Sequence, residues 1–296
     1  MTTARPEVWS AGGPTVLRIL VGAQLRRLRE AKGITRDTAG WEIRASESKI
    51  SRMELGRVGF KERDVADLLT LYGISDPGDR EAVLSLARDA NAPGWWQRYS
   101  DVAPNWFQPY IDLEAAASLI RLYHVQFVPG LLQTRDYARA IIRGAPELSG
   151  GEELERRVDL RIERQQLLTR PDPPHVWVVL DEAVLHRAIG GRDVLRAQLA
   201  ALVEATKLPN ITLQVVPFDT GKHPGEVQFT LLRYAEEELP DLVFMEQLYS
   251  ALYLDKREDV DMYAEAMERL CLQAPPPERT VEILESAVRR LDAADG

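Results

Sequence analysis

The side chains best suited to recognising another molecule lie in one polar stretch between Ile34 and Gly56. Arg52 could form paired hydrogen bonds with guanine, Glu47 could accept a hydrogen bond from cytosine, and Ser48 could contact a base or a phosphate. Phosphate groups could be met by the positive charges of Arg36, Lys49, Arg57 and Lys61. These residue types in one stretch predict contact with double-stranded DNA, and the alternative is a helix face that is merely charged and solvated.

Two short helices joined by a tight turn would position these side chains. Thr35 and Ser46 are good N-caps for the two helices, and Gly56 would end the second. Ile50 and Met53 are three residues apart, so they should face inward together. The residues that should then face outward are Glu47, Ser48, Ser51 and Arg52.

Gly40 lies in the middle of the first of these helices. Glycine there costs about 1 kcal/mol relative to alanine. We expect the second helix to pass close to this position, because a missing side chain allows a close approach.

Apolar residues at helical spacing flank this pair of helices on both sides. The first stripe ends at Gly33, another ends at Gly73, and Pro77 opens a further helix. We therefore expect an all-α domain of five helices over residues 15–91, preceded by a disordered tail at 1–14. The stripes comprise Leu17, Leu20, Val21, Leu25, Leu28, Val65, Leu68, Leu69, Tyr72, Val83, Leu84, Leu86 and Ala87.

The run LRRLREAKGITRDTAG…ASESKISRMELGR resembles the lambda-repressor-like (XRE-type) helix-turn-helix family over the first third of the chain. The resemblance implies that Arg36 contacts the DNA backbone or a base edge, and that Arg57 and Lys61 lie in a loop near phosphate. It places five residues on the recognition helix: Ser46, Glu47, Ser48, Lys49 and Arg52. The chain departs from the family in having Arg44 at the usual turn glycine and Ala39 at a usual leucine, so we expect an altered turn.

The charge of the chain is unevenly distributed. The whole sequence holds 37 Lys+Arg and 46 Asp+Glu, a net charge of −9. Residues 17–63 hold 12 Lys+Arg and 6 Asp+Glu, a net charge of +6, so the remainder carries −15. A basic face on an acidic body predicts localised DNA binding, with phosphate repelled elsewhere.

A second domain is expected over residues 92–296, where the sequence pattern changes. It begins with a crowd of aromatic residues, which would form either a hydrophobic joint between domains or a surface for a partner or ligand. Beyond them we expect helices at 113–123, 134–143, 152–169, 194–206, 259–272 and 277–291. The stretches HVWVVLDEAVL, ITLQVVPF, VQFTLLRY and DLVFMEQLYSALYL predict strands. The fold class is therefore α+β overall, with a mixed α/β second domain whose sheet is mainly antiparallel.

The segments GWWQRY and VQFVPGLLQTRDYARA, with the later sheet, resemble the C-terminal domain of actinobacterial antitoxin-like regulators. The resemblance implies that this domain binds a small acidic partner protein, without naming the residues that do so. A small-molecule effector bound against the sheet is the alternative. Because one recognition helix touches only a few base pairs, we expect a homodimer on a palindromic site.

Other classes of function have little support in the sequence. Asp181, Glu182 and His186 could form an acid–base pair, but no nucleophile motif, glycine-rich phosphate loop or metal-ligand spacing accompanies them, so we expect no enzyme, cofactor or metal. The lone Cys271 excludes an internal disulfide. The sequence contains neither an apolar run of membrane-spanning length nor a signal-peptide core, and we expect a cytoplasmic protein that makes no contact with a membrane.

Overall fold

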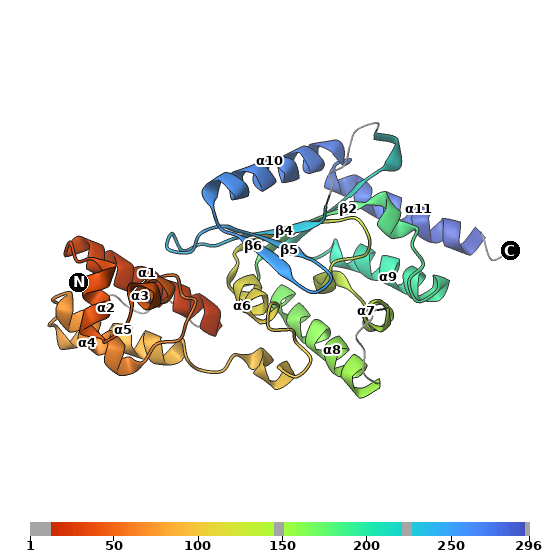
Figure 1. Ribbon diagram of the computed structural model, residues 1–296. Coiled ribbons are helices and arrows are strands. Elements are labelled where there is room, and N and C mark those ends of the chain that lie inside the picture. Colours follow the sequence, from red (N-terminus) through yellow and green to blue (C-terminus); the bar gives the residue numbers. More distant parts are fainter. Residues whose placement is uncertain (1–12, 145–150, 221–226, 294–296) are drawn as a thin grey trace. The chain divides into compact units, whose positions relative to one another are not determined.

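The computed structural model describes residues 13–144, 151–220 and 227–293, which form two compact units (Figure 1). The N-terminal unit comprises Met1–Arg98, Gln108–Ala116 and Ala235–Leu239, and the C-terminal unit comprises Tyr99–Phe107, Ala117–Tyr234 and Pro240–Gly296. The expected tail at 1–14 lies outside the described residues except for Gly13 and Pro14, and Pro14 already begins a helix.

The N-terminal unit contains the expected five helices among its described residues. They are α1 (Pro14–Ala31), α2 (Arg36–Glu42), α3 (Glu47–Glu54), α4 (Glu62–Leu71) and α5 (Pro77–Asp89). Helix α6 (Gln108–Ala116) groups with the same unit. The stripes found in the sequence meet in one core, which includes Leu25, Ala39, Ile50, Val65 and Leu69.

The described part of the C-terminal unit is built on a six-stranded sheet with the order β3-β2-β1-β4-β5-β6. Its strands are β1 (Leu119–His124), β2 (His175–Asp181), β3 (Ile211–Val216), β4 (Phe229–Arg233), β5 (Leu242–Glu246) and β6 (Ala251–Leu254). The pairs β1·β2 and β2·β3 are parallel, whereas β1·β4, β4·β5 and β5·β6 are antiparallel. The expected mixed, mainly antiparallel sheet is confirmed.

Helices cover both faces of this sheet. The unit contains α7 (Arg135–Arg143), α8 (Gly151–Arg164), α9 (Arg192–Ala205), α10 (Arg257–Gln273) and α11 (Thr280–Ala293). Figure 1 shows α10 over one face and α7, α8 and α9 on the other side. Tyr123, Phe229 and Met245 pack with α10, so the side chains next to them along each strand point to the opposite face.

The prediction of a helix over residues 113–123 is wrong for the second half of that range. Helix α6 ends at Ala116, and the next residues form β1 in the middle of the sheet. The apolar residues Leu113, Ala117 and Ile120 have helical spacing, which made the two structures hard to distinguish. Pairing of β1 with β2 and β4, which are distant in sequence, decides in favour of the strand.

Candidate nucleic-acid interface

Side-chain caps fix the beginnings of α2 and α3. The hydroxyl of Thr35 accepts a hydrogen bond from the backbone N–H of Thr38 at 3.1 Å, and that of Ser46 accepts one from Lys49 N–H at 3.2 Å. Each cap satisfies one of the free N–H groups of a helix start. Both expected caps are confirmed, and Ser46 therefore stands immediately before the first residue of α3.

The turn between α2 and α3 depends on two unusual backbone positions. A Cβ atom added to Gly40 would lie 2.8 Å from the carbonyl oxygen of Ala45, so the expected close approach at this glycine is confirmed. Arg44 has φ 53°, the left-handed conformation that glycine adopts more readily than any other residue. The expectation of an altered turn is wrong at this residue, because arginine here adopts the left-handed conformation that a glycine would take.

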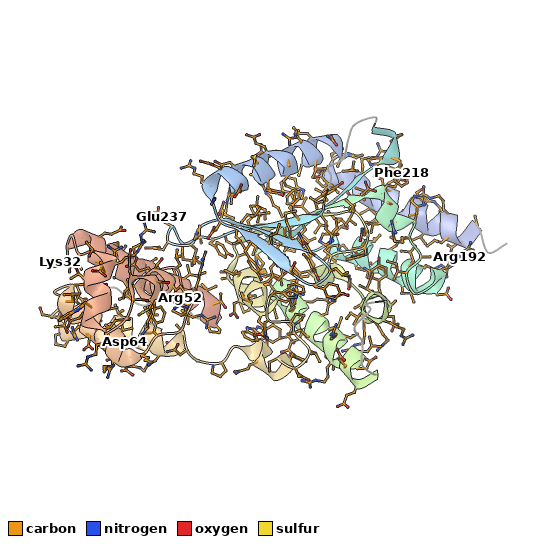
Figure 2. All side chains as sticks on the ribbon, in the orientation of Figure 1. Lys32, Arg52, Asp64, Arg192, Phe218 and Glu237 are labelled. Atoms are coloured by element: carbon orange, nitrogen blue, oxygen red, sulfur yellow. The ribbon has the colours of Figure 1, made fainter. Side chains whose placement is uncertain are left out.

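Helix α3 has a buried face and an exposed face, as its spacing predicts. Ile50 and Met53 are each 1% exposed and lie in the core of the unit. The polar residues Glu47, Ser48 and Arg52 are exposed on the other side, and Figure 2 labels Arg52 in this unit. Ser51 is half-buried at the boundary between the two faces.

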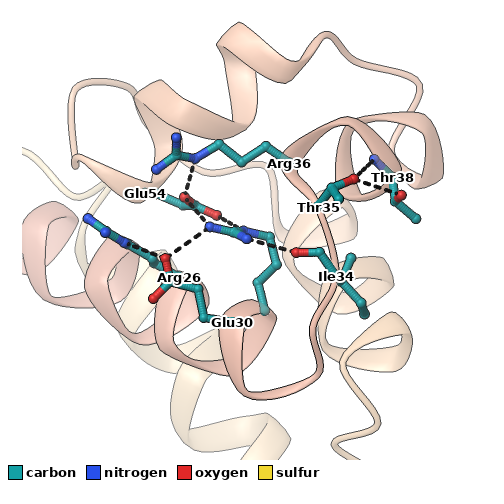
Figure 3. Close-up of polar contacts among 8 residues, drawn as sticks. Arg26, Glu30, Ile34, Thr35, Arg36, Thr38 and Glu54 are labelled. Atoms are coloured by element: carbon teal, nitrogen blue, oxygen red, sulfur yellow. Dashed lines mark hydrogen bonds and ion pairs between the residues drawn. The ribbon is translucent and has the colours of Figure 1, made fainter.

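Arg36 is tied to the last residue of α3. Its Nε donates to Oε2 of Glu54 at 2.8 Å, and its side chain remains 33% exposed (Figure 3). Arg29 of α1 donates to the same buried carboxylate, from Nη2 to Oε2 at 3.1 Å and from Nε to Oε1. Glu54 therefore holds α1, α2 and α3 together.

The hydrogen bond to Glu54 also raises the pKa of Arg29 above its ordinary value. A second donor from this arginine, Nη1, reaches the carbonyl oxygen of Ile34 at 2.8 Å. The guanidinium is therefore charged and fixed at the point where the chain leaves α1 for α2.

Lys49 makes a comparable connection to the next helix. Its Nζ lies 2.6 Å from Oδ2 of Asp64, whose side chain is only 3% exposed, so this ion pair joins α3 to α4. Five further cations within residues 36–63 have exposed side chains: Arg44, Arg52, Arg57, Lys61 and Arg63.

Reasoning from sequence missed both buried carboxylates. Glu54 follows Ile50 by four residues, so the same spacing that placed Ile50 inward could have placed Glu54 beside it. Asp64 precedes the buried Val65 in α4 and carried no comparable signal. The arrangement can present Ser48, Glu47 and Arg52 from a helix whose position is set by three ion pairs.

The aromatic residues near the start of the second domain are divided between the two units and have different hydrogen-bond partners. Trp96 donates from Nε1 to Oδ1 of Asp112 at 2.7 Å within the N-terminal unit. Tyr99 donates to Oε2 of Glu163 at 2.8 Å within the C-terminal unit.

The possible acid–base pair of the second domain also has structural partners. Nε2 of His186 lies 3.2 Å from Oε1 of Glu182, and the other oxygen of this carboxylate accepts from Phe218 N–H at 2.9 Å. Asp181 accepts from Ala183 N–H at 2.8 Å and thereby caps a short 3-10 turn. The described residues contain no group of three or more His, Cys, Asp or Glu that could hold a metal ion.

Two family models match the chain. The model described as "Helix-turn-helix domain" matches residues 20–83, and the model described as "Domain of unknown function (DUF5753)" matches residues 107–286. Neither the curated proteins nor the solved structures gave a match. Among the helices of the described residues, none is both long enough and apolar enough to cross a bilayer. The helix-turn-helix domain indicates a DNA-binding regulator.

Proposed function

This chain belongs to the DUF5753 family, and we propose that it is an XRE-type transcriptional regulator that reads a specific double-stranded DNA sequence with α3. One observation carries the proposal: Glu47, Ser48 and Arg52 are exposed on a helix that is capped and held by buried ion pairs. A helix fixed in this way can enter a major groove without being ordered on binding.

The eight candidate DNA contacts have different roles in this proposal. Arg52 pairs with a guanine, Glu47 accepts from a cytosine, and Ser48 contacts a base or a phosphate. Positive charge for the phosphates comes from Arg36, Lys49, Arg57 and Lys61, with Ser46 beside them at the helix start. Arg36 and Lys49 serve both the fold and the DNA, because each already pairs with a carboxylate.

The regulator binds as a homodimer to a palindrome whose half-sites are about one helical turn apart. One α3 spans only a few base pairs, and two copies would supply the specificity that a genome requires. We place the protein in the cytoplasm, where it would reach DNA, and assign it no membrane contact.

We propose an antitoxin-like role in which the C-terminal domain binds a small acidic partner protein. The support is the resemblance carried by VQFVPGLLQTRDYARA and GWWQRY. A second candidate is a small-molecule effector bound against the sheet of the same domain, where Nδ1 of His124 and Oε1 of Gln228 are buried without a hydrogen-bond partner among the described residues. We propose no enzymatic activity, because the carboxylates beside His186 already accept structural hydrogen bonds.

Genome-wide mapping of the sites bound by the full chain tests the DNA-binding proposal. We expect a shared palindromic motif, including a site near the chain's own promoter. Scattered occupancy with no common motif would overturn the proposal. Co-purification with the product of an adjacent open reading frame for a small acidic protein would support the antitoxin-like role. DNA occupancy that changes with a small metabolite, in the absence of such a protein, would favour the effector.

A further inference from the structure

Three polar residues lie side by side across the end of the sheet in the C-terminal unit. Tyr123 of β1 is opposite Phe229 of β4, and Thr230 of β4 is opposite Phe244 of β5. Continuing these antiparallel registers places His124, Gln228 and Glu246 in one row. Since Tyr123 and Phe229 point towards α10, the row points to the other face of the sheet, the face of α7, α8 and α9.

Two members of this row have buried polar atoms that find no hydrogen-bond partner among the residues the structure describes. They are Nδ1 of His124 and Oε1 of Gln228. Buried polar atoms are almost always paired, and each exception needs an explanation such as an absent ligand.

Two other buried amides of the unit, those of Gln198 and Gln214, are fully used. Gln198 of α9 donates to Leu132 O at 2.7 Å and accepts from Thr134 N–H at 2.7 Å. Gln214 of β3 accepts from Trp177 and donates to two carbonyl oxygens on the α10 side of the sheet. Gln228 differs from both, because no donor to its side-chain carbonyl oxygen is found in residues 13–144, 151–220 or 227–293.

An arginine with spare donors faces the carboxylate of the row. Arg161 of α8 donates from Nη1 to Oε1 of Gln133 at 2.9 Å. It also interacts electrostatically with Glu246, but within the described part of the chain the two form no ion pair. Burial lowers the pKa of Arg161 to about 10, which disfavours its charge. Desolvation also raises the pKa of Glu246, although this residue stays exposed to solvent at the end of β5, where a ligand can reach it.

A small molecule with one positive and one negative group would supply partners for all of these side chains. An ammonium group has three N–H donors, matching the three acceptors offered by Glu246, Gln228 and the Nδ1 of neutral His124. A carboxylate would accept the free donors of Arg161 in the planar geometry that a guanidinium favours.

We propose that His124, Gln228 and Glu246, faced by Arg161, bind a small zwitterion of the amino-acid type. The ammonium lies on the row and the carboxylate lies on Arg161. The binding itself is independent of DNA, and only the assignment of this ligand as an effector rests on the proposed function.

Thermal unfolding of the full chain with each of the twenty standard L-amino acids, added singly, tests the proposal. We expect at least one to raise the melting temperature in a concentration-dependent manner, because a ligand of the native state stabilises it. The N-acetyl derivative of that amino acid lacks the ammonium and should have no effect.

Substitutions then locate the site. Glu246→Gln and Arg161→Gln should each weaken binding by at least about tenfold, since each removes a charge-assisted hydrogen bond. The matched controls Glu265→Gln and Arg269→Gln lie on α10 with exposed side chains and should leave the affinity unchanged.

The results separate this inference from the proposed function. No shift with any of the twenty amino acids, or equal shifts in wild type and Glu246→Gln, would overturn the zwitterion site. DNA binding is measured on the same wild-type sample without amino acid. Failure of that sample to bind DNA would instead count against the proposed function.

Discussion

Arg36 and Glu54 join the first residue of α2 to the last residue of α3 through an Nε–Oε2 contact of 2.8 Å. The same carboxylate is held by Arg29 of α1, so one buried acid sets the position of the helix that carries the candidate base contacts. The orientation of α3 is therefore a property of the folded domain before any DNA is bound.

Neutralising this acid should destabilise the N-terminal unit. Glu54→Gln removes the carboxylate that holds the buried Arg29 and leaves only the half-exposed Glu30, 3.4 Å away, to balance its charge. The loss of a partner from a buried ion pair costs about 3–5 kcal/mol. Urea unfolding of the full chain measures the effect, with the exposed Glu47→Gln as control. A loss no larger than that of the control would mean that Glu54 does not hold the helices.

Arg44→Gly should stabilise the turn between α2 and α3. A residue with a side chain pays about 1–2 kcal/mol for the left-handed conformation at φ 53°, and glycine avoids most of that cost. Arg44→Ala separates this backbone effect from the loss of the guanidinium, because alanine keeps the strain. Equal melting temperatures for the glycine and alanine variants would contradict the backbone explanation.

Lys61→Ala should weaken binding to every DNA sequence alike. Lys61 is exposed at the start of α4 and is assigned to a phosphate. Its loss should therefore reduce the slope of log K against log salt concentration by about one. Titrations at several salt concentrations, on a specific site and on random DNA, measure it. An effect confined to the specific site would assign Lys61 to base reading instead.

The helix-turn-helix could be predicted from sequence because its signals are local. The caps at Thr35 and Ser46, and the inward spacing of Ile50 and Met53, each depend on residues within one helical turn. The ion pairs of Arg36 and Lys49 join separate helices, so the sequence alone assigned both residues to DNA.

Features that depend on distant pairing could not be predicted. The local spacing of apolar residues predicted a helix where β1 forms. The strand is stabilised by pairing with β2 and β4, which come much later in the chain and leave no signal near β1. The row of His124, Gln228 and Glu246 is brought together only by the registers of three strands. Its first and last members, His124 and Glu246, are more than a hundred positions apart in the sequence.

The stability of the chain should depend on pH through His124. Burial lowers its pKa to about 4, although hydrogen bonding to the Phe127 backbone opposes the shift. A histidine in the unfolded chain has a pKa of about 6.5. Between pH 4 and pH 6.5 the unfolded chain therefore binds more protons than the folded chain, and the free energy of unfolding rises with pH. We expect about 1–3 kcal/mol to be lost as the pH falls from 6.5 towards 4.

The raised pKa of Glu246 acts in the opposite direction, because its folded form binds the proton more tightly. Subtracting the pH–stability curve of His124→Gln from that of wild type isolates the contribution of the histidine. Identical curves for the two proteins would show that His124 titrates normally in the folded chain.

Selection of bound sequences from a random DNA library, by the full chain and by Arg52→Ala, tests the central claim that α3 reads bases. Wild type should enrich one palindromic motif, and Arg52→Ala should relax one base pair in each half-site with a loss of about 1–3 kcal/mol. Enrichment of the same motif with the same preference by both folded proteins would contradict the assignment of α3 as the recognition helix.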